Sequence, residues 1–324
     1  MQVNIRQKKA KSQLLFLGTI SLIAIIMFIG LGLTKNNYDY LLPKRIIRIV
    51  SVVISGGCIA FSAVIFQTIC NNRILTPSVL GLDSIYSFFQ TIVIFIFGTG
   101  SIVMTNKKIN FGLSLIGMLI ISAFIYKIVF SKKDNNIMYV LLVGLITGTF
   151  FNSLTSFMQV LIDPNEYLTL QNKLIASFSN VNSDILFIVI ILILLIIPFI
   201  YDDIKVLDVM SLGKEQAINL GIDYDKMMKK LMIVVAILTA IPTALVGPVT
   251  FLSLIVVNIT YQVISSYKHK YLLAGSVLIS VCSLILGLFL VERVFSFNTT
   301  LSIIINFIGG LYFLFILLKE RKND

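Results

Sequence analysis

Apolar runs of about 20 residues follow one another along almost the whole chain, and short polar segments separate them. A helix of this length spans the roughly 30 Å hydrocarbon core of a bilayer. The ten expected spans are residues 14–34, 46–69, 84–104, 110–130, 137–161, 184–201, 227–247, 250–265, 271–291 and 299–318. The pattern predicts an all-α polytopic membrane protein of about ten transmembrane helices, in a single domain over residues 1–324.

Composition agrees with this interpretation. The 324 residues are 57% hydrophobic and only 13% charged, with a mean hydropathy of +0.98, whereas soluble domains are about 25% charged. The first apolar run, Leu14 to Leu33, follows a basic start and has no small-residue cleavage site. We therefore expect it to be retained as a helix and not removed as a signal peptide.

The basic residues predict an orientation. If the N-terminus is cytoplasmic, the inner segments hold 18 of the 26 Lys and Arg residues and the outer segments hold 8. This is the direction of the positive-inside rule. An even number of spans then places both termini in the cytoplasm. Because the cations flank the spans, the net charge of +11 sets orientation and does not indicate a nucleic-acid partner.

The longest polar break, residues 202–230, is expected to form a cytoplasmic segment beside the membrane. Ser211 is a candidate N-cap of a short amphipathic helix and Gly221 a candidate stop. Leu212, Ala217 and Leu220 can share one face of that helix. Asp223 is expected to cap the next span. The segment taken alone is either a solvated loop or a docking helix for a soluble partner.

Two further irregular stretches stand out. Residues 163–183 are too polar to span, and we expect a short helix there on the outer side. The eighth span is short and follows Pro242, Gly247 and Pro248. A helix broken in this way either lines a pathway or packs as a kinked helix, and the sequence does not choose between these alternatives.

The side chains that catalysis would need are missing from the sequence. His269 is the only histidine, and Cys58, Cys70 and Cys282 have no paired spacing, so we expect no metal site and no disulfide. Gly213-Lys214 is not followed by Ser or Thr, so no P-loop is present. We expect a chain that is not an enzyme.

Ionisable residues are nearly absent from the spans. Asp83, Asp184 and Glu292 are expected at span ends. An ion-coupled transporter usually needs such groups at mid-membrane. The uncharged polar residues within spans are Gln67, Gln159, Asn258, Gln262 and Asn306. Each one either bonds a neighbouring helix or lines a pathway. An active transporter built in this way would take its energy from a separate protein.

Several stretches together resemble one family. The second-span region contains Pro43, Lys44, Arg45, Gly56, Gly57, Gln67, Asn72, Ile74, Pro77, Leu80 and Gly81 at matching spacing. Leu212 to Gly221 reads L-G-x-x-x-A-x-x-L-G, and Gly247 to Leu254 reads G-P-V-T-F-L-S-L. Lys268-His269-Lys270 follows. The combination is similar to the FecCD-type permeases of ABC importers for iron–siderophores and vitamin B12, over nearly the whole chain. Arg73, Ser253 and Val257-Asn258 depart from the family pattern.

The resemblance implies a vitamin B12 importer permease-like bundle and roles for particular residues. Residues Leu212, Gly213, Ala217, Leu220 and Gly221 would couple to an ATPase. Asn72 and Ile74 would contribute to a gate, and Gln67, Gln159 and Asn258 are the pathway candidates. Lys44, Arg45 and Arg293 would dock a substrate-binding protein on the outer side.

The resemblance also implies partners in a bacterial cytoplasmic membrane. These are a second permease chain, a cytoplasmic ABC ATPase dimer, an extracytoplasmic substrate-binding protein and the membrane lipid. ATP and Mg would belong to the ATPase, and an Fe(III)–siderophore would be the cargo, so the chain itself would hold no cofactor. Haem or a corrinoid is an alternative cargo, and an ion-gradient-driven secondary transporter is the rival class.

Overall fold

The structure is a computed structural model that describes residues 2–33, 35, 37–130, 137–179 and 181–321. Within them, ten helices match the ten expected spans. They are α1 (Gln2–Gly30), α2 (Tyr38–Cys70), α3 (Leu82–Phe97), α5 (Lys107–Val129), α6 (Ile137–Leu161), α8 (Ser183–Tyr201), α11 (Tyr224–Val246), α12 (Leu252–Val263), α13 (His269–Arg293) and α14 (Leu301–Arg321). Seven are long and apolar enough to cross a membrane, and α3, α12 and α14 are shorter apolar helices. The all-α polytopic architecture is confirmed. Thr34, the expected end of the first span, lies outside the described residues.

The centre of the bundle is formed by α2, α11 and α13, which pack closely against one another. Their apolar windows are mostly buried, whereas those of α1, α6 and α8 are mostly exposed, as expected for lipid-facing helices. A small residue permits the closest approach. A Cβ on Gly56 of α2 would lie 2.8 Å from Oγ of Ser280 on α13, so the two backbones can meet only because Gly56 has no side chain.

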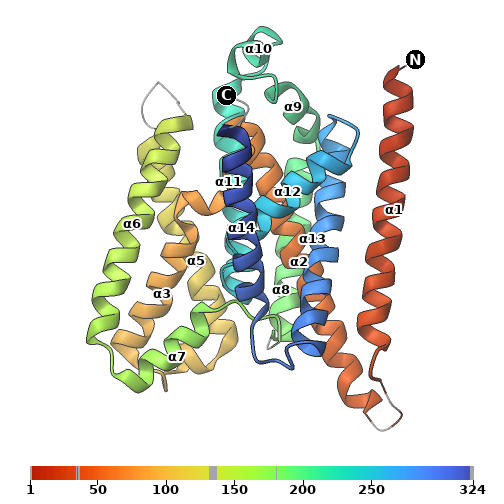
Figure 1. Ribbon diagram of the computed structural model, residues 1–324. Coiled ribbons are helices and arrows are strands. Elements are labelled where there is room, and N and C mark those ends of the chain that lie inside the picture. The colour runs from red at the N-terminus through yellow and green to blue at the C-terminus, as the bar shows by residue number, and fades with distance from the viewer. Residues whose placement is uncertain (1, 34, 36, 131–136, 180, 322–324) are drawn as a thin grey trace.

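Five short helices lie in the segments that connect the ten helices of the bundle. They are η1 (Pro77–Leu80), α4 (Ile102–Thr105), α7 (Pro164–Leu174), α9 (Asp203–Met210) and α10 (Lys214–Asn219). Helix α10 stands clear of the bundle at one end, and α7 lies at the opposite end (Figure 1). We name these the α10 end and the α7 end. Helix α7 confirms the short helix expected within residues 163–183, where Oδ1 of Asp163 caps it by accepting from Asn165 N at 2.9 Å.

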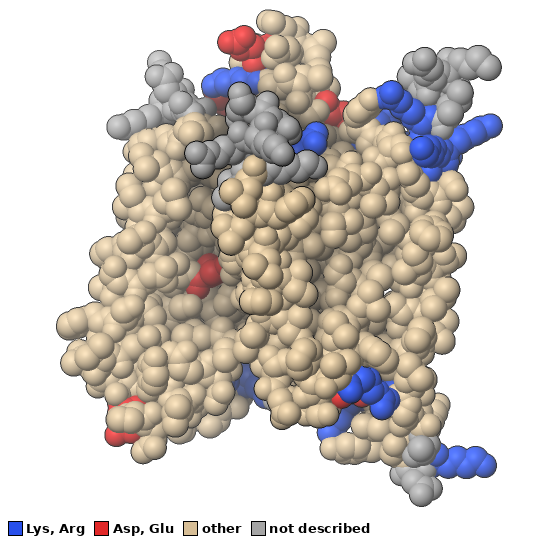
Figure 2. Space-filling view, in the orientation of Figure 1, with Lys and Arg blue, Asp and Glu red and all other residues tan. Residues whose placement is uncertain are grey.

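The positions of α1 and α14 agree with an even number of spans, which places the start of the first helix and the end of the last helix on the same side. The first residues of α1 and the last residues of α14 lie at the α10 end (Figure 1). The expected common side for the two ends of the chain and segment 202–230 therefore agrees with the fold. Most charged side chains gather at the two ends, and the broad band between them is uncharged in this view except for acidic atoms in one hollow (Figure 2). That the α10 end is the cytoplasmic end stays a prediction from the charge count.

The third expected span is wrong in its extent. Residues 84–104 do not form one helix, because α3 ends at Phe97 and Gly98 (φ +74°) turns the chain before α4 begins. The start of α3 is equally informative. It begins beside the middle of α6, since Gly81 lies against the backbone of Gly144 and Gly148. Helix α3 therefore starts inside the bundle.

Candidate functional site

Helix α10 and its flanking residues, 212–221, form a tip that protrudes at the α10 end. Two glycines shape this tip. Gly213 (φ +97°) caps the start of α10, and Gly221 (φ +85°) turns the chain after it. These backbone conformations favour glycine because a Cβ would clash. Ala217 is fully buried beneath the tip, while Leu212 and Leu220 are 56% and 62% exposed. The tip therefore presents apolar side chains to the space beyond the bundle.

Two expectations for this tip are wrong. Ser211 does not cap α10: its hydroxyl donates to Asp208 O at 2.8 Å and it ends α9 instead. The reason is that residues 203–210 form a helix of their own, which the hydropathy pattern did not predict. Leu212, Ala217 and Leu220 also do not share one face, because only Ala217 points inward. The cap on the next helix is confirmed, since Oδ1 of Asp223 accepts from Lys226 N at 3.1 Å.

Polar contacts tie the segment beneath the tip to the core. Oδ1 of Asp208 on α9 lies 2.7 Å from both the backbone N and Nδ1 of His269, the first residue of α13. Nε2 of His269 lies 2.8 Å from Oγ1 of Thr68 on α2. Lys230 on α11 pairs with Asp203 on α9 at 2.6 Å. A displacement of the tip would therefore reach α2, α11 and α13 directly.

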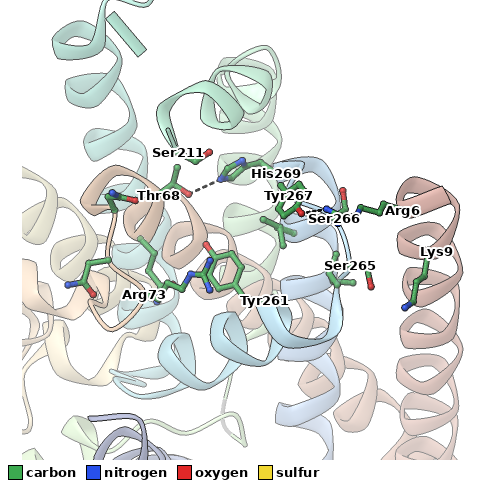
Figure 3. A pocket seen from close by; sticks show the side chains of 15 residues that line it. Arg6, Lys9, Thr68, Arg73, Ser211, Tyr261, Ser265, Ser266, Tyr267 and His269 are labelled. Atoms are coloured by element: carbon green, nitrogen blue, oxygen red, sulfur yellow. Dashed lines mark hydrogen bonds between the residues drawn. The ribbon is translucent and has the colours of Figure 1, made fainter. Parts of the chain in front are cut away.

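A polar cavity of about 720 Å³ opens beside this connection. It lies between the start of α1, the end of α2 and the loop from Ile264 to Lys268 (Figure 3). Its charged lining residues are Arg6, Lys9 and Arg73, with His269 at its edge. Gln67 also lines it and is 2% exposed, and neither amide atom of Gln67 has a hydrogen-bond partner among the described residues.

The gate and pathway candidates fall into two groups. Asn72 and Ile74 form one turn, in which Ile74 N donates to Oδ1 of Asn72 at 2.9 Å. Nδ2 of Asn258 donates to Arg73 O at 3.2 Å, which brings α12 to this turn. Gln67 lines the same cavity as Asn72. Gln159 lies apart, against α7 at the far end of α6. The structure thus brings four of the five together, and their roles stay predictions.

The three candidate docking cations lie at the α7 end, but they differ in exposure. Lys44 and Arg293 are exposed. Arg45 is only 4% exposed, and its Nη1 donates to the carbonyls of Phe28, Ile29 and Leu31. Its Nη2 lies 2.8 Å from Oε1 of Glu292. Arg45 therefore connects α1, α2 and α13 in this structure, and its side chain is not available for docking. The sequence around Arg45, a short basic run, did not indicate that it would be buried.

Asp83 is the main correction among the ionisable groups. It was expected at a span end, but it lies on the first turn of α3, inside the bundle. Thr250 Oγ1 lies 3.5 Å from its Oδ2, and no Lys or Arg of the described chain pairs with it. It lines a cavity of about 20 Å³ with hydroxyl-bearing residues of α2 and α11, which is room for about one water. Acidic atoms lie in a hollow midway between the ends (Figure 2).

Little in the sequence indicates that Asp83 lies inside the bundle. Its position depends on residues 71–81 turning back into the bundle before α3 begins. Pro77 and the glycine at 81 are turn signals, but they do not state how deep the turn lies. The Asp208–His269 contact joins residues 61 positions apart, so no local pattern could have revealed it.

Comparison with known proteins agrees with this architecture. Residues 12–319 match the FecCD transport family. The petrobactin import system permease protein YclO of Bacillus subtilis (strain 168) is 52% identical over 301 residues, covering 93% of this chain and 94% of that protein. The petrobactin import system permease protein YclN of the same organism is 26% identical, and the match covers 96% of this chain and 99% of that protein.

One solved structure has a closely similar fold. It is described as an inward-facing conformation of an ABC transporter of the metal-chelate type. The TM-score is 0.81, the identity is 20%, and the match covers 96% of this chain and 99% of the other. This likeness concerns the fold alone. The match of the family over residues 12–319, together with the 52% identity, decides the assignment: this chain belongs to the FecCD transport family.

Proposed function

We propose that this chain is a permease subunit of an ABC importer that moves an iron–siderophore complex across the bacterial cytoplasmic membrane. The observation that carries the proposal is the 52% identity with a petrobactin import permease over 93% of the chain. The match extends over 93% of this chain and 94% of the relative, so it is not confined to one helix or one end of the bundle. Petrobactin or a related siderophore is accordingly the cargo to test first.

The tip supports docking of a cytoplasmic ATPase dimer. Leu212, Ile218 and Leu220 are all more than half exposed, on α10 or directly beside its two ends, beyond the apolar band. Apolar side chains gathered at such a position are typical of a protein interface. ATP and Mg²⁺ would be bound by the ATPase, and this chain would contribute the pathway and the mechanical link through α9 to α13.

Two more partners complete the proposed importer. YclO and YclN of Bacillus subtilis are both described as petrobactin import permeases, so we propose a related but different chain as the second permease. At the α7 end, Lys44 and Arg293 would meet acidic side chains of a substrate-binding protein. Exposed ion pairs contribute only about 0–1 kcal/mol each, so they would orient the protein more than hold it.

The first experiment is purification of the tagged chain from its native membrane in mild detergent. We expect a P-loop ATPase to copurify with the wild type, and to be lost from Leu212→Glu/Leu220→Glu together with siderophore uptake. Leu168→Glu is the matched control, because Leu168 is equally exposed but lies on α7 at the other end. Retention of the ATPase and of uptake in the double variant would refute docking at the tip.

A secondary transporter remains the rival because of Asp83, whose carboxylate has the depth that ion coupling needs. Vesicles that contain the purified subunits separate the two classes. The importer predicts uptake that requires ATP and persists when an ionophore collapses the ion gradients. Uptake that stops with the ionophore while ATP is present would favour ion coupling.

A further inference from the structure

The polar cavity at the α10 end is shaped for an anion. Its three charged lining residues besides His269 are all cations, and no acidic side chain of the described residues lines it. The neighbouring carboxylate of Asp208 is already engaged by His269, with two contacts of 2.7 Å. A cavity lined in this way concentrates negative charge.

Gln67 is the second observation that points to a ligand. Burial of an amide without a partner is destabilising, and Gln67 leaves both Nε2 and Oε1 unpaired among the described residues while lining this cavity. A bound molecule with oxygen atoms would accept from Nε2. The helix-packing alternative for Gln67 requires a protein partner, which the described residues do not supply.

The cations stand at two sides of the cavity. Arg6 and Lys9 project from α1 toward the loop that contains Ser265 and Tyr267, and Arg73 lies on the opposite side against Tyr261 (Figure 3). The Arg73 guanidinium lies 4.6 Å from the Tyr261 ring centre, and Arg6 lies 5.2 Å from that of Tyr267. These cation–π contacts, together with the hydrogen bond from Nη1 of Arg6 to the Tyr267 hydroxyl, orient the guanidinium groups without neutralising their charge.

Size and position favour a lipid over a free ion. A volume of about 720 Å³ is far larger than one phosphate ion requires. The cavity adjoins α1, whose Leu15, Phe16 and Leu22 face outward as lipid-facing residues do. Basic pockets at the end of a helical bundle bind anionic lipid headgroups elsewhere.

We propose that this cavity binds a phosphate-bearing anion, the headgroup of an anionic phospholipid, through Arg6, Lys9, Arg73 and the amide of Gln67. The bound headgroup would join α1 to the end of α2, directly beside Asn72 and the Asp208–His269 contact. The proposal does not depend on which cargo the chain carries.

The test is the thermal unfolding midpoint of the full-length chain in detergent with phosphatidylglycerol, phosphatidylcholine or sodium phosphate added. We expect phosphatidylglycerol to raise the midpoint and phosphatidylcholine not to. Each cation removed singly should weaken phosphatidylglycerol binding about fivefold, the equivalent of about 1 kcal/mol per basic residue. The triple variant Arg6→Ala/Lys9→Ala/Arg73→Ala should lose the shift.

Two further variants keep the test decisive. Lys205→Ala/Lys226→Ala removes exposed cations at the same end but outside the cavity, and should keep the wild-type shift. Gln67→Leu should raise the lipid-free midpoint, since the unpaired amide is gone, and yet reduce the shift with phosphatidylglycerol. A purely structural Gln67 would not produce these opposite signs.

Each outcome of the test either supports the proposal or contradicts it. A shift that sodium phosphate reproduces in full supports the anion site and identifies a free ion as its ligand. A wild-type shift in the triple variant, or an equal loss in the Lys205/Lys226 control, would overturn the proposal. So would a midpoint of the wild type that neither phosphatidylglycerol nor phosphate changes.

Discussion

Asp208 and His269 form the contact that connects the protruding tip to the core of the bundle. One carboxylate oxygen of Asp208 lies 2.7 Å from two nitrogens of His269, and the imidazole reaches on to Thr68 of α2. An ionised carboxylate only accepts, so Nδ1 of His269 carries a proton. The Thr68 hydroxyl also lies 2.7 Å from Val64 O, and its single proton is donated either to this carbonyl or to Nε2 of His269. Three helices therefore share one hydrogen-bond chain that starts on α9.

Asp208→Ala should weaken both folding and coupling. Loss of two hydrogen bonds to a charged group should lower the free energy of unfolding by about 1.5–3 kcal/mol. We also expect fewer cargo molecules imported per ATP hydrolysed in reconstituted vesicles, because the tip would move without carrying α13. Asp225→Asn is the control: it breaks the half-exposed pair of Lys214 and Asp225, which contributes about 0–1 kcal/mol. An unchanged import-to-hydrolysis ratio in Asp208→Ala would show that the contact is structural only.

Arg45→Met should be strongly destabilising. The substitution leaves Glu292, which has a side-chain exposure of 16%, with only Arg48 at 3.6 Å. Removal of one partner of a buried pair costs about 3–5 kcal/mol. Lys44→Met, next in the chain but exposed, should change stability by about 0.5 kcal/mol or less. Thermal unfolding in detergent compares the two, and Arg45→Met/Glu292→Gln should recover part of the loss. Equal stabilities of the two single variants would contradict the buried role of Arg45.

Gly144 and Gly148 of α6 should respond differently to alanine. A Cβ on Gly144 would lie 2.8 Å from the carbonyl oxygen of Val79, whereas one on Gly148 would meet nothing closer than 3.4 Å. Gly144→Ala is therefore expected to push η1 off α6 and to cost about 1–3 kcal/mol, while Gly148→Ala is tolerated. The unfolding midpoints of the two variants measure this. The reverse order would mean that η1 does not rest on α6 at this point.

Asp83→Asn tests whether the carboxyl group of Asp83, inside the bundle, is needed for transport. Asparagine can keep a contact to Thr250 and cannot ionise, whereas an ionised carboxylate costs roughly 2.5–3.5 kcal/mol in the middle of a membrane. We expect unchanged or higher stability and preserved ATP-driven uptake, since the proposed importer takes its energy from an ATPase. A stable variant that no longer transports would assign Asp83 to the transport cycle and strengthen the ion-coupled rival.

The periodic properties of this chain could be predicted from its sequence. Ten apolar runs became ten helices because a run of that length can satisfy its backbone in lipid only as a helix. The cap at Asp223, the stop at Gly221 and the short helix after Asp163 were also predicted, since each depends on residues within one turn. The motif from Leu212 to Gly221 predicted a short helix in this segment, which is confirmed, whereas docking of an ATPase there stays a prediction.

What depended on distant parts of the chain could not be predicted. Arg45 belongs to a short basic run, and only the packing of α1 and α13 around it shows a buried cation. Asp83 was expected at a span end because hydropathy reports how far an apolar run extends and not where in the bundle it starts. Gln67 and Gln159 were equivalent in sequence, yet one lines the polar cavity and the other lies at the far end of α6. Local chemistry determined the helices and their caps, whereas the depth and the partners of each polar side chain were decided by helices far apart in sequence that pack together.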